Sequence, residues 1–464
     1  MGHRHGFWQP PWLIPILYAS GFLHWLLFFK LGKLTFRAFD WGKEYIYYSL
    51  LKQWIETGRI PYHIDLAFHG THRFLAIPEV NLSPQILLLP LVQVGTFVVI
   101  NTILLYSIGF IGCLLIKQRY RLGIASFTLL FLIFNFNGHL IAHIGVGHSM
   151  WAGYFLLPFY FLYLLELIGD MPGRAPYKIA LVMLAILLQG AFHIFIWCLT
   201  LLVLILIFNL KILKPVAQAI GLSLVAGAFR LIPAGFALIG KKEKFIWSYP
   251  TVRDLIDALI TIREQTPVRL KPWGTTGWWE YDVYIGLIGL AIIITFGIIM
   301  RFSKRADLKD YRFPRLDLPI FAMAILSISY IHAFLTRIPL PVLKSERVAT
   351  RFIIIPLLLV TLLAAIRLEK VIGNLRHTLR FKVIAIGLVS LMSLGFIDHS
   401  YLWSVARLER IHAKRVVDLT IAALISRSDP YYKGLLWISL VITLITVVLL
   451  VRSLATRRRK GNLD

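Results

Sequence analysis

The chain has 464 residues, of which 58% are hydrophobic and 14% aromatic, whereas only 16% are charged. A water-soluble domain carries roughly a quarter charged residues and about half apolar ones, so this composition excludes an ordinary soluble enzyme and a disordered chain. With only two cysteines, a disulfide-stapled secreted domain is excluded as well. The sequence therefore indicates a membrane protein.

The formal net charge is +26, from 49 Lys and Arg against 23 Asp and Glu. On a soluble protein this excess would suggest nucleic acid as the partner. Here the basic residues lie between apolar runs, where anionic head groups and lipid phosphates are the nearer partners. We therefore expect contact with a lipid bilayer and no nucleic acid binding.

Apolar runs of about 20 residues, the length that crosses a bilayer, recur along the whole chain. They predict an all-α bundle of roughly twelve transmembrane helices, or about 11 to 13 if the uncertain runs are divided differently. The run 178–210 is divided into two spans, but Gln189 and Gly190 in its middle leave a single broken helix as the alternative. The predicted spans are 11–30, 94–116, 123–142, 149–168, 178–192, 193–210, 215–240, 282–300, 317–336, 350–366, 383–400 and 434–451.

Short segments rich in Lys and Arg follow the second, sixth, eighth and tenth predicted spans, and another lies at the end of the chain. Because positive residues are retained on the cytoplasmic side, twelve spans place both termini in the cytoplasm. The first span lacks a cleavage site and is interpreted as a signal anchor of a multi-pass cell-membrane protein. One transmembrane domain over 1–464 without a separate soluble domain is expected, with outer segments at 31–84, 241–281, 337–349 and 401–433.

The first outer segment, 31–84, is too polar to span and carries the pattern of an amphipathic helix. Between Lys43 and Thr57 the apolar residues recur at helical spacing, and Glu44 belongs to the polar side of the pattern. Gly58 is expected to end this helix. The pattern predicts a helix that lies on the membrane surface.

A second interfacial helix is expected over 84–93, with Ser83 at its N-cap, Pro84 at its first position and a break at Pro90. The histidine-rich stretch before it lacks a ligand set with metal-binding spacing. His72 in this stretch is a possible substrate contact.

Several short motifs, taken in order, resemble one family. They are an aspartate beyond the first span, an amphipathic helix that ends in Gly-x-x-Pro, a loop that closes with Ser83-Pro84, the run Gly147-His148-Ser149-Met150-Trp151, the pair Leu157-Pro158, and the stretch 345–352. This layout is similar to the GT-C class of membrane glycosyltransferases, in its YfhO-like and dolichyl-phosphate-mannose-protein mannosyltransferase-like branches. The resemblance covers most of the chain in layout but only about five short stretches in residues.

The resemblance implies a glycosyltransferase that moves a sugar from a polyprenyl-phosphate donor to a lipid, glycan or protein acceptor, with an extracytoplasmic active site. Asp40 then corresponds to the catalytic aspartate of the first loop. The residue chemistry agrees, because an acceptor hydroxyl needs a general base. The alternative is that Asp40 only caps the following helix, where Asp is favoured. Glu44 and Glu79 are possible supporting acids.

A lipid-phosphate leaving group needs fixed positive charge near its bridging oxygen. Arg347 and Arg351 are four residues apart and would share a helix face, so either is a candidate phosphate contact. Arg230 lies inside an apolar run, where a charge is costly enough to suggest function. The alternatives are that Arg347 and Arg351 reach ordinary head groups or that Glu346 pairs with one of them. For Arg230 the alternative is that its span starts later and leaves it near an interface.

Glu280 is a further possible supporting acid, and His148 is a possible substrate contact. Glu280 lies in a Trp-Trp-acid-Tyr run similar to the acceptor motif of oligosaccharyltransferase catalytic subunits, although Glu replaces Asp and Asp282 replaces Gly. An aromatic belt at the membrane interface is the alternative for this run. His148 follows Gly147 and could contact substrate, or it is a satisfied polar residue at a helix end.

The main rival function is a transporter or lipid flippase. Ion-coupled transporters place acidic residues near mid-membrane, and no predicted span has one at its centre. A non-catalytic structural protein is a third alternative. No residue pattern in the sequence indicates a cofactor or a metal site, and the transfer chemistry is compatible with a divalent cation.

Overall fold

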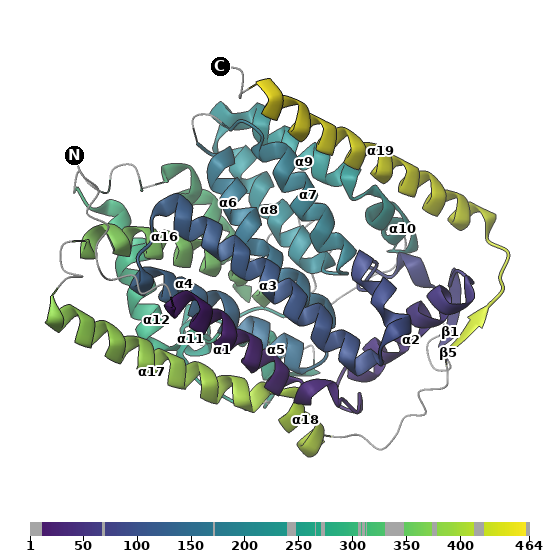
Figure 1. The fold of residues 1–464 in the computed structure, drawn as a ribbon, viewed down its shortest axis with the longest axis horizontal. Coiled ribbons are helices and arrows are strands. Elements are labelled where there is room, and N and C mark those ends of the chain that lie inside the picture. Colours follow the sequence, from purple (N-terminus) through teal and green to yellow (C-terminus); the bar gives the residue numbers. More distant parts are fainter. Residues whose placement is uncertain are drawn as a thin grey trace. The chain divides into compact units, whose positions relative to one another are not determined.

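The computed structural model describes residues 12–66, 70–169, 172–238, 247–264, 266–270, 274–304, 308, 311, 313–329, 348–373, 378–412 and 422–460. The described residues are predominantly helical (Figure 1). The chain divides into two compact units. Unit 1 takes the described parts of Met1–Leu31, Tyr106–Val146 and Phe245–Leu408, and unit 2 those of Gly32–Leu105, Gly147–Lys244 and Glu409–Asp464.

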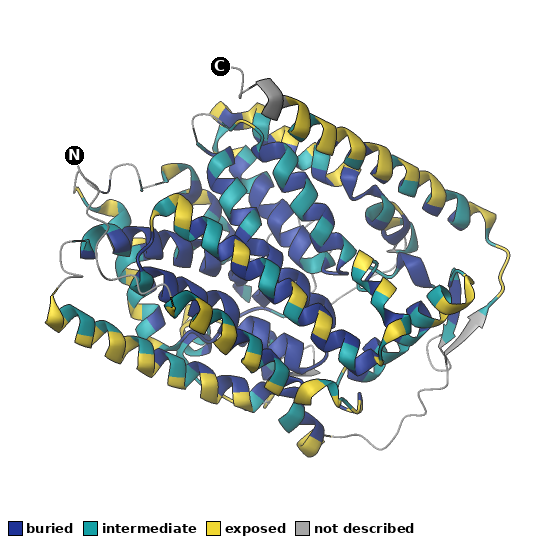
Figure 2. Cartoon of the chain, in the orientation of Figure 1, coloured by how far each residue is buried: buried dark blue, intermediate teal, exposed yellow. Residues whose placement is uncertain are grey.

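Unit 1 is built around α16, whose apolar residues are buried on almost every side (Figure 2). This helix packs on α4 and on a π-helical turn, η7, and α17 packs on α4, α5 and α12. The helices are α1 (Leu13–Phe28), α4 (Ile124–Phe136), α5 (Gly138–Gly145), α11 (Val252–Ile260), α12 (Gly286–Ile292), η7 (Ile293–Ile298), η8 (Ile299–Phe302), η10 (Pro314–Leu316), α13 (Asp317–Ile325), η11 (Ala349–Ile353), α16 (Ile354–Ile372) and α17 (Leu379–Trp403). A two-stranded sheet, β3 (Pro267–Leu270) and β4 (Gly274–Gly277), precedes the turn η6 (Trp278–Glu280).

Unit 2 has α7 at its centre, packed on α6, α8 and α9, with α19 along α9 and α10. The helices are α2 (Trp41–Thr57), η2 (Phe74–Ala76), η3 (Pro84–Leu91), η4 (Ser149–Leu156), α6 (Leu157–Leu167), α7 (Ala175–Leu188), α8 (Phe192–Phe208), η5 (Leu210–Ile212), α9 (Leu213–Ala226), α10 (Ala228–Leu238) and α19 (Pro430–Lys460). Three short strands, β1 (His63–Leu66), β2 (Gly70–Arg73) and β5 (Ala422–Ile425), form an antiparallel sheet in the order β2-β1-β5. Helices α3 (Val94–Tyr120) and α18 (Val405–His412) contribute residues to both units.

Among the described residues, six helices are long and apolar enough to cross a membrane, or seven if one bent pair is counted as a single span. That pair is Phe192–Phe208 with Leu210–Ala226, bent by 112°. Helices α17 and α19 leave long rows of apolar side chains exposed (Figure 2), as expected for faces that contact lipid. These helices indicate a membrane protein. The count of twelve spans and the GT-C arrangement stay predictions.

Polar and glycine residues divide two of the apolar runs in the structure. The run 178–210 forms two helices, α7 and α8, as predicted from Gln189 and Gly190, and Gly190 adopts a φ of +77° between them. The run 123–142 is divided into α4 and α5 at Asn137, whose side chain accepts a hydrogen bond from the Leu140 amide. The break at Asn137 was not predicted, because it depends on a single polar residue within an apolar run.

The first outer segment contains the predicted amphipathic helix, with one correction. Helix α2 begins at Trp41 and ends at Gly58, whose left-handed backbone confirms the predicted stop. However, Glu44 is buried, so its assignment to the polar, water-facing side was wrong. The reason is tertiary: η4 of the same unit supplies a hydrogen-bond partner, Ser149, for this carboxyl group.

The second predicted helix, 84–93, is a 3₁₀ helix over Pro84–Leu91 that runs through Pro90. Ser83 occupies its N-cap position without a side-chain capping hydrogen bond. The histidine-rich stretch between the two helices was expected to be a loop. Its described residues instead form the strands β1 and β2 and the 3₁₀ turn η2.

Candidate functional site

The backbone that leads into Asp40 is held in an unusual conformation. Phe36 and Phe39 have positive φ angles of 56° and 50°, which bulky residues rarely adopt. Glu409 accepts hydrogen bonds from the amides of Thr35 and Phe36, and the ring of Phe39 lies 5.4 Å from that of His412. Strained residues of this kind persist only where their surroundings fix them, and they concentrate at functional sites.

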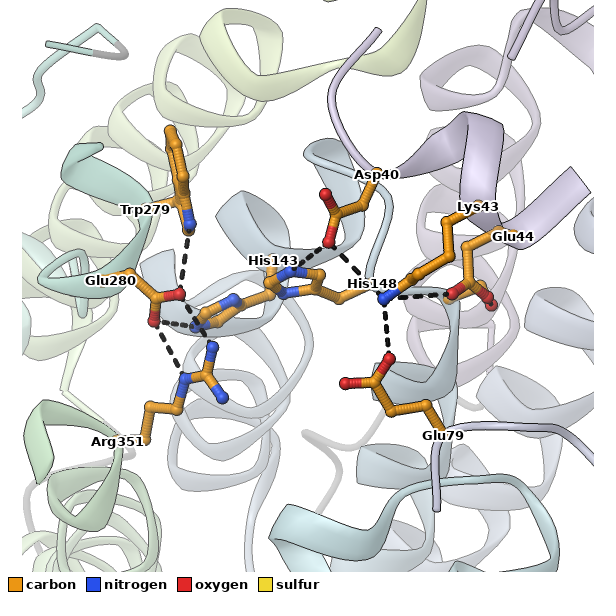
Figure 3. A network of polar contacts seen from close by, with 10 residues as sticks. Asp40, Lys43, Glu44, Glu79, His143, His148, Trp279, Glu280 and Arg351 are labelled. Carbon is orange, nitrogen blue, oxygen red and sulfur yellow. Dashed lines mark hydrogen bonds and ion pairs between the residues drawn. The ribbon is translucent and has the colours of Figure 1, made fainter. Parts of the chain in front are cut away.

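Asp40 occupies the N-cap position of α2, but its side chain makes no capping hydrogen bond. Its Oδ2 atom lies 3.4 Å from His148 Nε2 and 3.5 Å from Lys43 Nζ instead, as Figure 3 shows. The side chain is 50% exposed. The carboxylate is therefore held by two cationic or hydrogen-bonding groups while one side remains open to an incoming molecule.

Lys43 is the centre of the cluster, because its ammonium group faces three carboxyl groups (Figure 3). Its Nζ atom lies 2.6 Å from Glu79 Oε2, 3.5 Å from Asp40 Oδ2 and 3.9 Å from Glu44 Oε1. Asp40 and Lys43 are three residues apart at the start of α2, a spacing that puts their side chains on one face. Lys43 was not among the predicted site residues, although the Asp-x-x-Lys-Glu spacing is visible in the sequence.

Glu44 differs from the other two acids in its surroundings. Its side chain is buried, and Ser149 donates a short hydrogen bond to Oε2, while the Tyr48 hydroxyl lies 2.8 Å from Ser149 Oγ. Burial raises the pKa of Glu44 to about 7, because a buried carboxylate loses its hydration. Near neutral pH this residue therefore lies close to its own titration point.

Asp40 and Glu79 are shifted in the opposite direction. Burial tends to raise both pKa values, but the hydrogen bond and charge of His148, followed by those of Lys43, hold the pKa of Asp40 well below its usual range. Lys43 similarly outweighs burial at Glu79 and lowers its pKa to about 2. The cluster thus combines two ionised carboxylates with one acid of near-neutral pKa, an arrangement typical of acid–base sites.

Two glycines allow the segments of this cluster to approach closely. A Cβ atom on Gly147, whose φ is +96°, would lie 2.5 Å from the amide nitrogen of Trp41. A Cβ atom on Gly190, whose φ is +77°, would lie 2.2 Å from the carbonyl oxygen of Glu79. Both positions therefore require glycine, and they fix where Asp40 and Glu79 enter the cluster.

An aromatic row extends from the cluster into unit 2. The ring of Trp151 lies 5.1 Å from that of His148 and 5.9 Å from that of His193, and His193 stacks on Trp197. The charge of His193 also helps to lower the pKa of Glu79. His193 was not predicted as a site residue. It lies within an apolar run, and no motif in that run indicates contact with the first outer segment.

In unit 1, Glu280 and Arg351 form a closed ion pair. Arg351 donates from Nε and Nη2 to the two Glu280 oxygens, at 2.9 and 2.7 Å, as Figure 3 shows. Trp279 Nε1 donates to the same carboxylate, and His143 Nε2 lies 3.9 Å from it. Both partners are buried, with exposed fractions of 5% and 7%. This geometry supports a structural pair more directly than a phosphate contact by Arg351.

The other two predicted phosphate ligands are placed differently. Arg230 donates hydrogen bonds to four backbone carbonyl oxygens, which belong to Leu75, Ile77, Pro78 and Val80. Its guanidinium group is buried and occupied by these oxygens, which argues against the predicted contact with a donor phosphate. Arg347 lies outside the described residues.

The described residues contain no group of three or more His, Cys, Asp or Glu side chains arranged to hold a metal ion. No protein-family model, curated protein or solved structure matches this chain. The case for a function therefore depends on the geometry of the Asp40 cluster and on the sequence resemblance.

Proposed function

We propose that the protein is a membrane glycosyltransferase of the GT-C kind, which transfers a sugar from a polyprenyl-phosphate donor to an extracytoplasmic lipid, glycan or protein acceptor. One observation carries this proposal. The Asp40 carboxylate does not cap α2 but lies half-exposed between His148 and Lys43. This is the arrangement that a general base at the membrane boundary requires.

Asp40 is the best candidate for the base because it combines access with ionisation. Its side chain is 50% exposed, whereas that of Glu44 is 3% exposed and that of Glu79 is 25% exposed and bound to Lys43. A general base must first be within reach of the proton that it accepts, and its pKa is the second criterion. Glu44 has the more suitable pKa but no access for an acceptor.

In the proposed reaction the acceptor hydroxyl oxygen attacks the anomeric carbon of the donor sugar, opposite the phosphate. The new C–O bond forms as the bond to the phosphate oxygen breaks, and the phosphate leaves with the electron pair, so the anomeric configuration inverts. Asp40 accepts the hydroxyl proton. A carboxylate with a low pKa is a weak base, so the proton moves once bond formation has made the hydroxyl acidic.

The proposal includes a membrane topology. The chain would have about twelve spans, both termini in the cytoplasm and the Asp40 cluster on the outer side of the membrane. The lipid tail of the donor would then remain in the bilayer while its sugar reaches the half-exposed carboxylate. Exposed apolar faces on α17 and α19 support a lipid environment for both units.

The test uses the full-length protein in nanodiscs, with a panel of radiolabelled undecaprenyl-phosphate hexoses as donors and membrane extract as acceptor. Asp40→Asn is expected to lower transfer by about 10²- to 10⁴-fold, the usual contribution of a general base. Asp65→Asn is the matched control, because Asp65 is a carboxylate of the same outer segment on β1. Full transfer by Asp40→Asn would exclude the base role, and movement of donor across the bilayer without transfer would favour a transporter.

A further inference from the structure

A cavity of about 400 Å³ lies in unit 2, next to the β2-β1-β5 sheet. This volume suits a small polar ligand or the head group of a larger one. The side chains that give it chemical character are Tyr47, His63, His72, Arg73, Arg427 and Asp429. The cavity therefore combines cationic and hydrogen-bonding groups from α2, from the adjacent strands β1 and β2, and from the distant segment that precedes α19.

Arg73 is held in place by contacts that leave much of its guanidinium group unused. Its Nε atom donates to Asp429 Oδ2 at 2.9 Å, and its guanidinium carbon lies 4.6 Å from the ring of Phe236 and 5.5 Å from that of Tyr432. With the described residues, its two terminal nitrogens form no hydrogen bond. A fixed guanidinium fork with free donors is the group that recognises carboxylate or phosphate.

Asp429 does not cancel this positive charge toward a ligand, because its oxygens are engaged. Oδ1 accepts the amide of Tyr432 at the start of α19, and Oδ2 lies 2.9 Å from Arg73 Nε and 3.3 Å from His63 Nε2. The carboxylate therefore serves to position Arg73 and the helix start. Its remaining effect on the cavity is to balance one of two guanidinium charges.

The second guanidinium belongs to Arg427, which is exposed and has no hydrogen bond or ion pair with another described residue. Two arginines against one aspartate leave an excess of one positive charge, before any contribution from His63 or His72. His72 lies beside Arg73 on β2, so the predicted substrate contact is placed on the wall of this cavity.

The cavity adjoins the Asp40 cluster. Tyr47, on its wall, follows Lys43 by one turn of α2, so the two side chains share a helix face. The wall residues Ile77 and Pro78 lead directly to Glu79. A ligand in the cavity would therefore lie beside the groups assigned to the transfer reaction.

The walls also indicate which substrate part would fit. All of them come from segments outside the helices that are long and apolar enough to span a membrane. Their aliphatic members are Ala76, Ile77, Pro78 and Ala237, so a single large aliphatic side chain lines the cavity and no row of such residues offers a path for a polyprenyl chain. The cavity therefore fits the water-facing part of the acceptor better than the lipid-linked donor.

We propose that this cavity binds an oxyanion, a phosphate or carboxylate group carried by the acceptor, through Arg73 and Arg427. This inference rests on the proposed function only where it identifies the ligand as the acceptor of the transfer reaction. The binding of an oxyanion can be measured whether or not sugar transfer is detected.

The experiment measures binding of three soluble probes to the full-length protein in phosphatidylcholine nanodiscs by titration calorimetry. Glycerol 3-phosphate represents a phospholipid-like acceptor, glucuronate represents an acidic glycan, and glycerol is the neutral control. One of the two anions is expected to bind, and Arg427→Gln and Arg73→Gln are each expected to weaken it tenfold or more. Preference between the anions identifies the source of the oxyanion.

Two control variants, and the choice of Arg427 as a test position, make the result decisive. Arg59→Gln removes an exposed arginine elsewhere in the same outer segment and should leave binding unchanged. Arg427→Gln breaks no contact with a described residue, so its loss of binding would not reflect unfolding. Asp40→Asn should bind the anion normally, which separates this inference from the catalytic proposal. Equal effects of Arg59→Gln and Arg427→Gln, or binding of neither anion, would overturn it.

Discussion

Two groups of charged residues, one in each unit, differ in how completely their charges are satisfied. The Glu280–Arg351 pair of unit 1 is buried and joined by two hydrogen bonds, so that each charge has one opposite partner. In the Asp40 cluster of unit 2, a single ammonium group at Lys43 faces three carboxyl groups. One arrangement is closed and balanced, and the other is half-open with an excess of acid.

This difference separates structural from functional charge more clearly than burial does. A balanced buried pair has no protonation state to change and no open side for a ligand. In the Asp40 cluster, burial raises the pKa of Glu44, whereas the charge of Lys43 outweighs burial at Glu79 and lowers its pKa. Chemistry is therefore expected at the unbalanced cluster.

The largest expected effect comes from breaking the balanced pair. Arg351→Met leaves Glu280 buried without its counter-ion and is expected to lower the free energy of unfolding by about 3–5 kcal/mol. Thermal or denaturant unfolding in detergent measures this loss.

The double variant Glu280→Met/Arg351→Met is the control for that experiment. Replacing both charges by apolar side chains should restore most of the stability, since a buried pair is often no better than hydrophobic packing. If the double variant is stable but does not transfer sugar, Arg351 returns to the predicted role of a phosphate contact.

The next effect is a pH dependence at Glu44. Its pKa in the folded chain, about 7, lies above the ordinary value of 4.5, so between these values the folded state keeps a proton that the unfolded chain releases. The free energy of unfolding should therefore fall as pH rises through this window, by about 3 kcal/mol at most. Glu44→Gln should remove this fall, which unfolding at pH 5 and pH 8 measures.

Glu56→Gln is the matched control, because Glu56 lies on the same helix with a side chain 46% exposed. Its pH dependence should follow the unmodified protein. An identical fall in the Glu44→Gln variant would show that the carboxyl group of Glu44 is not the group that titrates.

A smaller stability effect, with a large effect on activity, is expected from the two close-packed glycines. Gly147→Ala and Gly190→Ala should each cost about 1–3 kcal/mol, because the added Cβ atom would meet backbone atoms of the cluster. Transfer should fall about 10²-fold if Asp40 or Glu79 moves by about 1 Å.

Gly58→Ala separates the clash from the backbone strain. Gly58 also has a positive φ, +70°, but nothing lies within 4 Å of its Cβ position. This variant should lose about 1 kcal/mol and keep its transfer activity. Equal losses of activity in all three variants would mean that the close approach does not position the cluster.

Much of the fold could be predicted because apolar runs and helix stops are local signals. The apolar run at 434–451 lies within α19, and Gly58 ends α2 as expected. The strands β1 and β2 were missed because they have four residues each and contain polar side chains such as Asp65. Strand β1 also pairs with β5, which is distant in sequence, so no local pattern indicates the third strand of this sheet.

The candidate site could be predicted only in part. Asp40 and His148 were selected separately, and the structure places them 3.4 Å apart. The burial of Glu44 and the role of Gly190 depend on contacts between segments that are distant in sequence. Such contacts cannot be read from the sequence of one chain. The hydrogen bonds from Arg230 to carbonyl oxygens could not be predicted either. Every residue has a carbonyl group, and the sequence does not show which of them lie close to Arg230.

Arg230 has a wider consequence for how a segment without regular structure can be packed inside a protein. The stretch 75–80 has little regular secondary structure of its own, yet four of its carbonyl oxygens accept hydrogen bonds from one planar group. A buried carbonyl oxygen needs such a partner, because leaving it unpaired costs free energy. A lysine, with three donors on a single nitrogen, could not reproduce this fan of bonds. One side chain thus supplies hydrogen bonds that several water molecules would otherwise make. Glu79 can therefore be held by an irregular segment instead of a helix.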